Sequence, residues 1–255
     1  LIQEQNGFAG LTNKKLGSRV QCICVAYEGM ERFFPADKIV MTGNPIRSII
    51  VPATPEMKEA GIKEYGLDPS RKHIFIVGGS LGSARFNQCM KEWISDGCPG
   101  LDGVDVLWQC GKHYRPDIDR FMDEQRTKNP DVARHIHHSD FIGRMELAYA
   151  AADVVISRSG ASSVSELCAA RKAVIFIPSP NVAEDHQTHN AMALVKKDAA
   201  VVVKDAEAME KMIPTALELL KDPARIARLE ENAGKMALPD AAEKIAEEVY
   251  KLIKD

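Results

Sequence analysis

The chain has 255 residues, enough for one large or two modest domains, each able to bury a hydrophobic core without disulfides or metals. Hydrophobic residues make up 45% of it and charged residues 27%, and the net charge of −3 arises from well-mixed acids and bases. The composition gives no reason to expect a nucleic-acid partner, and no apolar run could cross a bilayer, so we expect a soluble, cytoplasmic protein.

The chain opens within an apolar run that reads as the last residues of a strand, and it begins with Leu1 rather than methionine. We therefore interpret the sequence as a piece of a longer protein. Short β-rich runs then alternate with helical patterns, as in right-handed βαβ units with a parallel sheet. The predicted strands are residues 20–25, 38–41, 73–77, 104–109, 154–157, 173–178 and 200–203. This alternation predicts an α/β fold.

Residues 42–57 read as a linker between two such units. Pro45, Pro52 and Pro55 disfavour a regular helix in this stretch. We therefore expect the linker to cross between two domains.

A glycine-rich turn follows the predicted strand at residues 73–77. The dinucleotide fingerprint G-x-G-x-x-G does not fit Gly78, Gly79 and Gly82, and no G-K-S/T follows to make a Walker motif. Two interpretations remain open. The backbone N–H groups and the following helix dipole could take an anion, or the turn could simply join a strand to a helix.

Residue types that bind metals are present but poorly spaced. The six cysteines lack a second pair at ligand spacing, so we expect buried free thiols. The acids of residues 117–119 begin a helical pattern, where they can complement the helix dipole. His135, His137 and His138 alternate in an extended stretch, which places two on one face and one on the other. We therefore expect no metal site.

A second turn of small residues, 158–163, follows the predicted strand at 154–157. Glu166 lies three residues after Ser163 and shares its helical face. Its carboxylate could accept both hydroxyls of a ribose cis-diol, while the small side chains let a phosphate approach. The alternative is an acid that only complements the helix dipole.

Polar side chains gather in a third segment, residues 180–191, just beyond the strand at 173–178. His186, Gln187 and Asn190 could hydrogen-bond sugar hydroxyls there, because open parallel sheets bind ligands at the carboxyl ends of their strands. The alternative is a solvated loop that caps the next helix.

From residue 206 onward the pattern is helical only. Three helices are predicted, separated at residues 222–223 and 239–240. The last one carries a single apolar stripe, so we expect it to dock on another part of the protein. The stripe consists of Ala242, Ile245, Ala246, Val249 and Ile253.

Six segments, taken together and in this order, resemble the MurG family. They are residues 3–14 (QEQNGFAGLTNK), 43–47 (GNPIR), 77–87 (VGGSLGSARFN), 141–145 (FIGRM), 152–166 (ADVVISRSGASSVSE) and 184–191 (EDHQTHNA). Members of this family are bacterial transferases that add N-acetylglucosamine from UDP-GlcNAc to lipid I, which gives lipid II for peptidoglycan. The match covers essentially the whole chain.

The resemblance implies a GT-B fold, in which two Rossmann-like domains face each other across a cleft. Residues 1–44 would be the C-terminal remnant of the N-terminal acceptor domain, and residues 45–238 the UDP-sugar donor domain. Residues 239–255 would form a terminal helix packed on the N-terminal domain. Roughly a hundred residues, about one small domain less its tail, would lie upstream.

The resemblance also implies how the phosphates and the ribose are held. Arg47 and Ser80 match positions that contact the diphosphate. Ser162 and Ser163 match the turn that holds phosphate and ribose. Glu166 matches the carboxylate on the ribose hydroxyls.

The other matched positions concern the base and the sugar. Phe141 and Ile142 match the uracil pocket, with main-chain groups of Ile142 on the base edge. His186 and Gln187 match a pair on the sugar hydroxyls, where other members carry two glutamines. The cleft motif near the transferred sugar is matched by Asn6 and Glu4, with Gln3 in place of a frequent histidine, so Gln3 is given no proton-transfer role.

The implied reaction is an inverting displacement at the anomeric carbon by the 4-hydroxyl of lipid I, with neither metal nor cofactor. Arg47 and helix dipoles would stabilise the departing diphosphate. The general base would lie in the N-terminal part, through which the full enzyme would touch the cytoplasmic membrane surface. This chain alone would bind UDP-GlcNAc and transfer nothing.

Three alternatives remain. The chain could be a UDP-GlcNAc 2-epimerase-like GT-B enzyme or a non-catalytic nucleotide-sugar binding subunit with a separate membrane partner. It could also be a structural or interaction module whose glycine turns bind no phosphate.

Overall fold

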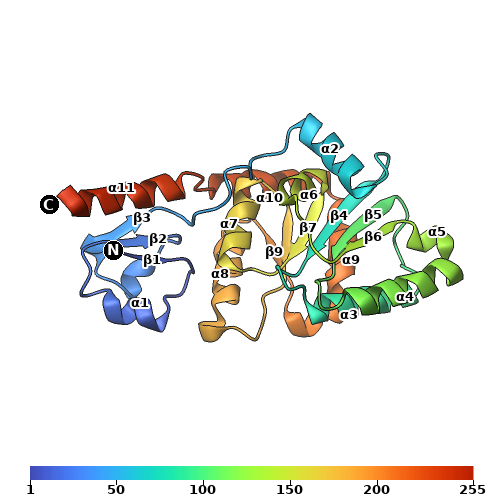
Figure 1. Cartoon of the computed structure of the whole chain (residues 1–255), viewed down its shortest axis with the longest axis horizontal. Helices are drawn as coiled ribbons and strands as arrows, with labels where there is room; N and C mark the ends of the chain where they lie inside the picture. The colour runs from blue at the N-terminus through green and yellow to red at the C-terminus, as the bar shows by residue number, and fades with distance from the viewer. Residues whose placement is uncertain (255) are drawn as a thin grey trace.

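The computed structural model describes residues 1–254, and its strands form two parallel sheets (Figure 1). The small sheet contains β1 (Ile2–Glu4), β2 (Ile23–Val25) and β3 (Ile39–Met41) in the order β1-β2-β3. The large sheet has the order β6-β5-β4-β7-β8-β9. Its strands are β4 (Lys72–Val77), β5 (Val104–Gln109), β6 (Ile136–Ser139), β7 (Val154–Ser157), β8 (Val174–Phe176) and β9 (Val201–Val202). Each strand pairing is parallel, which confirms the predicted α/β class.

Helices cover both faces of the large sheet, and the side chains of β4 show how its two cores are divided. Ile74 and Ile76 belong to the core that includes side chains of α3 and α9, whereas Phe75 and Val77 belong to the core that includes α6 and α7. This division follows from the pleat, because successive side chains of a strand point to opposite faces. The helices around this sheet are α2 (Pro55–Tyr65), α3 (Ala84–Ser95), α4 (Arg115–Lys128), α5 (Pro130–Ala133), α6 (Met145–Ala151), α7 (Ala161–Ala169), α8 (His186–Val195), α9 (Ala208–Leu220) and α10 (Pro223–Lys235).

The segment between β3 and α2 is irregular up to residue 54, but Pro55 begins a helix instead of preventing one. Proline is well suited to the first position of a helix, because its missing N–H group would have no partner there. Thr54 caps this helix by accepting a hydrogen bond from the Met57 amide at 3.3 Å. The expectation that all three prolines exclude helix is therefore wrong for Pro55.

Gly61 lies where α2 packs against α6, and we expect Gly61→Ala to lower the free energy of unfolding by about 1–3 kcal/mol. A Cβ atom at this position would overlap the carbonyl oxygen of Leu147 and lie 3.1 Å from the Cβ of Ala151. Urea denaturation would measure the change. The matched control is Gly234→Ala in α10, whose new Cβ would meet only the Arg171 side chain, which is flexible and exposed. Equal losses in the two variants would contradict the prediction.

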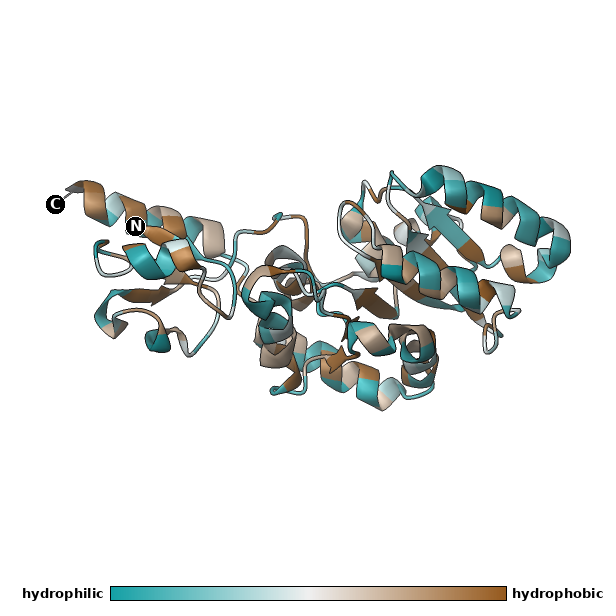
Figure 2. Cartoon of the chain, turned by 90° about the horizontal axis from the view of Figure 1, so that it is seen from below, coloured by the Kyte–Doolittle hydropathy of each residue, from teal (hydrophilic) through white to brown (hydrophobic). Residues whose placement is uncertain are grey.

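The last helix, α11 (Ala241–Lys254), runs along the small sheet, beyond the edge of the large one (Figures 1 and 2). The thiol of Cys22 on the β1–β2 loop lies 3.9 Å from the Glu248 carboxylate. The face of α11 that is partly covered carries Ile245, Glu248 and Leu252. Most of the predicted stripe is exposed among the described residues, including Val249 at 40% and Ile253 at 71%, so its docking on another part of the protein stays a prediction.

The structure also shows the length of the helices and the state of the cysteines. Within residues 1–254, no helix is long and apolar enough to cross a bilayer. All six cysteines are buried and free in this described part of the chain. Burial raises the pKa of Cys98 to about 12, so its thiol stays protonated.

Candidate functional site

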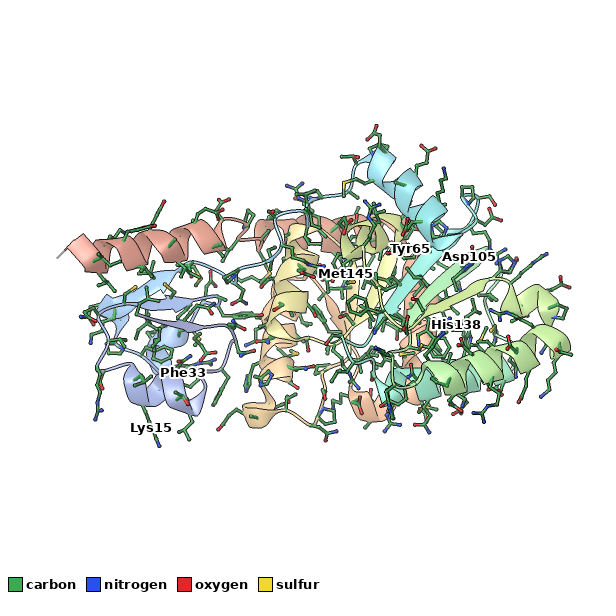
Figure 3. The ribbon with its side chains drawn as sticks, in the orientation of Figure 1. Lys15, Phe33, Tyr65, Asp105, His138 and Met145 are labelled. Carbon is green, nitrogen blue, oxygen red and sulfur yellow. The ribbon has the colours of Figure 1, made fainter. Side chains whose placement is uncertain are left out.

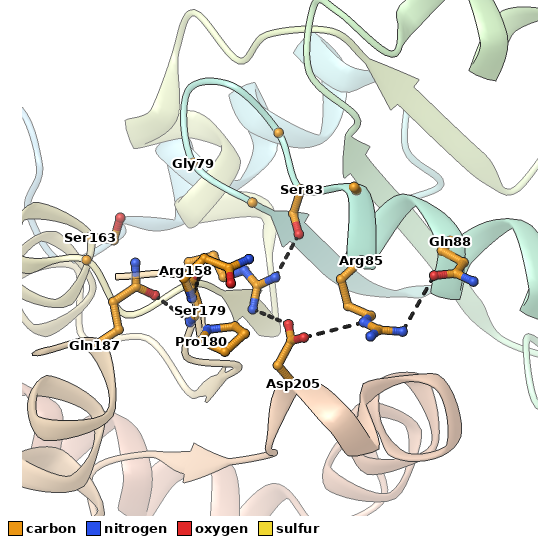
Figure 4. Close-up of a pocket in the computed structure, with 15 residues that line it drawn as sticks. Gly79, Ser83, Arg85, Gln88, Arg158, Ser163, Ser179, Pro180, Gln187 and Asp205 are labelled. Atoms are coloured by element: carbon orange, nitrogen blue, oxygen red, sulfur yellow. Dashed lines mark hydrogen bonds and ion pairs between the residues drawn. The ribbon is translucent and has the colours of Figure 1, made fainter. Parts of the chain in front are cut away.

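Turns that follow three strands of the large sheet line one pocket at the carboxyl ends of those strands (Figure 4). Its volume is about 560 Å³. The lining includes Gly78, Gly79 and Gly82 after β4, Gly160 and Ser163 after β7, and Ser179, Asn181 and Gln187 after β8. The structure therefore brings together the three segments that the sequence marked for anion and sugar binding, at the edge where parallel sheets bind ligands.

The first turn needs glycine for a steric reason. Gly82 has a φ of +77°, and a Cβ atom there would overlap the Cys110 carbonyl oxygen, because the turn lies directly on the chain that follows β5. The turn then leads into α3, whose N-cap Ser83 accepts a hydrogen bond from the Phe86 amide at 3.3 Å. Glycines at the pocket wall leave backbone N–H groups accessible to a ligand.

The charges around the pocket suit an anion. The N-termini of α3 and α7 both open toward it, since Ser83 and Gly160, their N-cap residues, are part of its lining. Helix N-termini carry partial positive charge and attract phosphate groups. Arg85 and Arg158 add two full positive charges, and Asp205 supplies the one acid among the described lining residues. A diphosphate fits this balance.

Arg158 holds the pocket wall together, a role that the sequence analysis missed. Its guanidinium donates to Asp205 at 2.6 Å and to the Ser83 hydroxyl at 3.0 Å (Figure 4). It also donates to the Ile177 carbonyl at 2.9 Å. It also lies over the Phe86 ring, 4.6 Å from the centroid. The available signal was its position: a charged residue directly after a buried strand, at the carboxyl edge of the sheet.

Glu166 and Arg47, which were expected to contact different parts of a nucleotide, form an ion pair with each other. Arg47 Nε donates to Glu166 Oε1 at 3.0 Å and Nη2 donates to Oε2 at 3.1 Å. The Tyr149 hydroxyl donates to Oε2 at 3.3 Å. Burial, together with the neighbouring Glu166 charge, raises the pKa of Tyr149 well above its usual value, so it remains a donor.

Asn44 places Arg47 beside α7. The buried Asn44 amide donates to the Ser165 hydroxyl at 3.1 Å and to the Gln5 carbonyl at 2.9 Å. It also accepts a hydrogen bond from Gln3 Nε2 at 3.0 Å. Residues 43–47 are thereby tied to both β1 and α7.

The N-terminal segment is joined to α8 through Asn190, whose side chain is completely buried. Asn190 Oδ1 accepts from the Gly7 amide at 2.8 Å, and Nδ2 donates to Asn6 Oδ1 at 3.0 Å. The structure thus uses the Asn190 amide within the protein, which corrects its proposed contact with sugar hydroxyls. Glu4 is also buried, and it accepts hydrogen bonds from the amides of Asn6 and Gly10.

Of the expected site residues, Ser163 and Gln187 line the pocket, whereas Asn6, Glu4, Arg47, Ser80, Phe141, Ile142, Ser162, Glu166 and His186 are outside its lining. Ser80 and Ser162 are exposed on their respective turns. On the loop after β6, Phe141 is 59% exposed and Ile142 is buried.

Of the two residues expected to bind the sugar hydroxyls, one lines the pocket and the other does not. Gln187 lines the pocket, where its Oε1 accepts from the Ser179 amide at 2.9 Å. His186 instead turns its Nδ1 toward the Ala183 carbonyl, at 2.8 Å.

The three histidines and the acids near them pair with one another. His135 Nδ1 and His137 Nε2 lie 2.8 and 3.6 Å from the two oxygens of Asp105, whereas His138 Nε2 lies 2.7 Å from Asp119 (Figure 3). The predicted division of the histidines between two faces is confirmed. Among residues 1–254, no group of three or more His, Cys, Asp or Glu side chains could hold a metal ion.

A six-stranded parallel sheet with a pocket at its carboxyl edge, beside a second small parallel sheet, is the arrangement of the GT-B fold. The crystal structure of Acinetobacter baumannii MurG superposes with a TM-score of 0.72 at 25% identity, over 98% of this chain and 66% of that one. Anabaena HepE, solved with UDP and glucose, shares the fold at a TM-score of 0.61 and 12% identity, over 98% of this chain and 71% of that one.

The model of the glycosyltransferase family 28 C-terminal domain matches residues 73–245, and the chain belongs to this family. It is 48% identical over 252 residues to a Bacteroides thetaiotaomicron protein and 49% identical to one from Bacteroides fragilis, covering 99% of this chain in both cases. Both relatives are named UDP-N-acetylglucosamine–N-acetylmuramyl-(pentapeptide) pyrophosphoryl-undecaprenol N-acetylglucosamine transferase. The chain spans 66% and 64% of their lengths, slightly less than two thirds. These similarities confirm the resemblance to the MurG family.

Proposed function

We propose that this chain carries the donor site of an enzyme that transfers N-acetylglucosamine from UDP-GlcNAc to the 4-hydroxyl of the muramyl sugar of lipid I, forming lipid II. The observation that carries this proposal is the pocket into which two helix N-termini and two glycine turns open. The name of the Bacteroides relatives supplies the substrates. Because the chain spans less than two thirds of their lengths, the complete activity is proposed for the whole protein.

The chemistry of each turn supports a proposed position for each part of the donor. The diphosphate lies against the N-termini of α3 and α7, where backbone N–H groups and dipoles favour negative charge. The ribose lies against the first turn of α7, and the sugar faces the segment before α8. The proposed contacts are Arg47 and Ser80 for diphosphate, Ser162, Ser163 and Glu166 for phosphate and ribose, Phe141 and Ile142 for uracil, and Asn6, His186 and Gln187 for the sugar.

The proposed reaction is a single displacement. The acceptor 4-oxygen forms a bond to the anomeric carbon as the bond from that carbon to the diphosphate oxygen breaks, which inverts the α-linked donor to a β product. The charge that develops on the leaving diphosphate is stabilised by fixed N–H groups and arginines, so the proposal includes neither a metal nor a cofactor.

The general base is proposed to come from the acceptor-binding side of the enzyme. The carboxylates around the pocket are already engaged: Glu166 by Arg47, Asp205 by Arg158, and Glu4 by backbone amides. A base must reach the hydroxyl that it deprotonates, and these groups are held elsewhere.

We assign residues 45–238 to the donor domain, residues 1–44 to the acceptor domain, and residues 239–255 to a helix that packs on the acceptor domain. Lipid I is a membrane lipid, so the whole enzyme is proposed to work at the cytoplasmic face of the membrane as a peripheral protein. On its own, the present chain is proposed to bind UDP-GlcNAc without transferring the sugar.

Calorimetric titration with UDP-GlcNAc, UDP, GDP and NAD tests the donor site. We expect saturable binding of the two uridine nucleotides, weakened at least about tenfold by Glu166→Ala, because hydrogen bonds to a charged group contribute about 1.5–3 kcal/mol. The control Glu231→Ala, which removes an exposed acid paired with Lys235, should leave binding unchanged. Equal affinity for GDP or NAD, or no binding of UDP, would refute the proposal.

A further inference from the structure

The Glu166 carboxylate, which is proposed to bind the ribose, already forms an ion pair with Arg47. We propose that Arg47 closes Glu166 in the ligand-free site and exchanges partners when the donor binds, so that a ligand must carry a diphosphate to open the ribose subsite. This inference rests on the proposed function. It makes Arg47 a specificity-determining residue that selects nucleoside diphosphates against the bare nucleoside.

The burial of the two side chains indicates that Arg47, rather than Glu166, moves in the proposed exchange. The Glu166 side chain is 12% exposed and the Arg47 side chain 45%. Glu166 is also held by the Tyr149 hydroxyl, and the Tyr149 ring packs edge-on against Phe75 with centroids 6.0 Å apart. Arg47 stands on the irregular segment before α2, and in the described part of the chain its guanidinium donates hydrogen bonds to Glu166 alone. Arg47 can therefore leave while Glu166 stays.

The position to which the Arg47 guanidinium would move, at the N-terminus of α7, is close to the Glu166 carboxylate. Side chains in a helix lean toward its N-terminus, so the Glu166 carboxylate lies over the first turn of α7, near Ser162 and Ser163. Ser163 lines the pocket, and the α7 N-terminus is one of its two anion-attracting ends. A change of side-chain torsions is enough to turn the guanidinium from the carboxylate toward an anion at that end.

Whether the exchange of partners is favourable depends on the diphosphate of the ligand. Two ribose hydroxyls can replace the two N–H groups that Arg47 donates, so the number of hydrogen bonds to Glu166 is conserved. The charge is not conserved, because neutral donors would replace a cation beside a largely buried carboxylate. A diphosphate offsets this loss by receiving the displaced guanidinium. Uridine offers no such group and must compete with Arg47 for Glu166.

Titration of Arg47→Ala with uridine and with UDP tests the exchange. We expect uridine to bind about tenfold tighter than to the unchanged chain and UDP about tenfold weaker, since each involves loss of one charge-assisted contact. The preference for UDP over uridine should thus fall about a hundredfold. The control Arg228→Ala removes a similarly exposed arginine paired with Asp198, and should alter neither affinity.

A second variant distinguishes loss of the exchange from damage to the fold. Arg47→Lys keeps the positive charge but loses the two-pronged contact, so uridine should tighten by less than in Arg47→Ala. If uridine binds equally well or more weakly in both Arg47 variants while UDP still binds to the unchanged chain, the exchange is refuted and the donor site stands. If the unchanged chain does not bind UDP at all, the proposed function fails first, and the exchange fails with it.

Discussion

Replacing Arg158 with methionine is expected to lower the free energy of unfolding by about 3–5 kcal/mol, the usual cost of breaking a buried ion pair from one side. Arg158 and Asp205 are both largely buried, with side chains 13% and 15% exposed. The same guanidinium binds the N-cap of α3 through the Ser83 hydroxyl and the end of strand β8 through the Ile177 carbonyl. Methionine fills a similar volume but donates nothing, so Ser83 and the Ile177 carbonyl lose this donor, and Asp205 keeps only its longer contact with Arg85, at 3.4 Å.

Chemical denaturation of Arg158→Met would measure the loss, with Arg225→Met as its control. Arg225 pairs with Asp198 at 2.8 Å, but its side chain is 31% exposed and stands on α10. We expect that control to lose less than about 1 kcal/mol. Arg158→Lys should recover only part of the stability, because a single ammonium group cannot reach the same set of acceptors. Similar losses in Arg158→Met and Arg225→Met would show that Arg158 does not tie the pocket together.

Asp105→Asn is expected to destabilise the protein by about 3–5 kcal/mol, through a cluster at the opposite, amino edge of the large sheet. The Asp105 side chain is 1% exposed, and one of its oxygens lies 2.7 Å from Arg71 Nε (Figure 3). The other accepts from the Asp68 amide at 2.8 Å, and His135 lies 2.8 Å from the first. The asparagine variant leaves Arg71 buried beside a neutral group.

The same cluster gives a dependence on pH. Burial alone would raise the pKa of Asp105, but its contacts with His137, the Asp68 amide and His135 outweigh burial and lower the pKa to about 2. An Asp with a lowered pKa stabilises the fold above its ordinary pKa of about 4 and loses that contribution as the pH falls. Stability should therefore decline between pH 4 and pH 2.

Urea denaturation at several pH values would measure both effects. In Asp105→Asn the decline below pH 4 should be shallower, because the titrating group is gone. The control Asp123→Asn removes an acid that is 72% exposed and paired with Arg126, and should change the stability by less than about 1 kcal/mol. An unchanged acid slope in Asp105→Asn would assign the decline to other carboxylates.

The parts of the fold that could be predicted are those encoded locally. Strands such as β4 and β5 are rich in β-branched and aromatic residues, and the turn at Gly78–Gly82 combines glycines with a following helix, so each can be recognised within about ten residues. The ligand edge follows from the parallel sheet by geometry, since the ends of its strands must meet. For this reason the sequence is enough to predict that these turns lie at one edge of the sheet.

The side-chain partners of those turns could not be predicted. Arg47 and Glu166 are 119 residues apart, and Arg158 and Asp205 are 47 apart, so nothing in either neighbourhood indicates the other. The partly covered face of α11 could not be predicted for a related reason. A helix with apolar residues on adjacent sides can turn either side inward, and the surface that it meets decides which one.

The hydrogen bond between Gly7 and Asn190 joins residues 183 positions apart, and this separation bears on how the chain folds. Closing so long a loop is entropically costly until the intervening sheet has already shortened it. The contact can therefore add to the finished structure without helping to nucleate it. We therefore expect the contact between Gly7 and Asn190 to form late in folding, once α8 is in place.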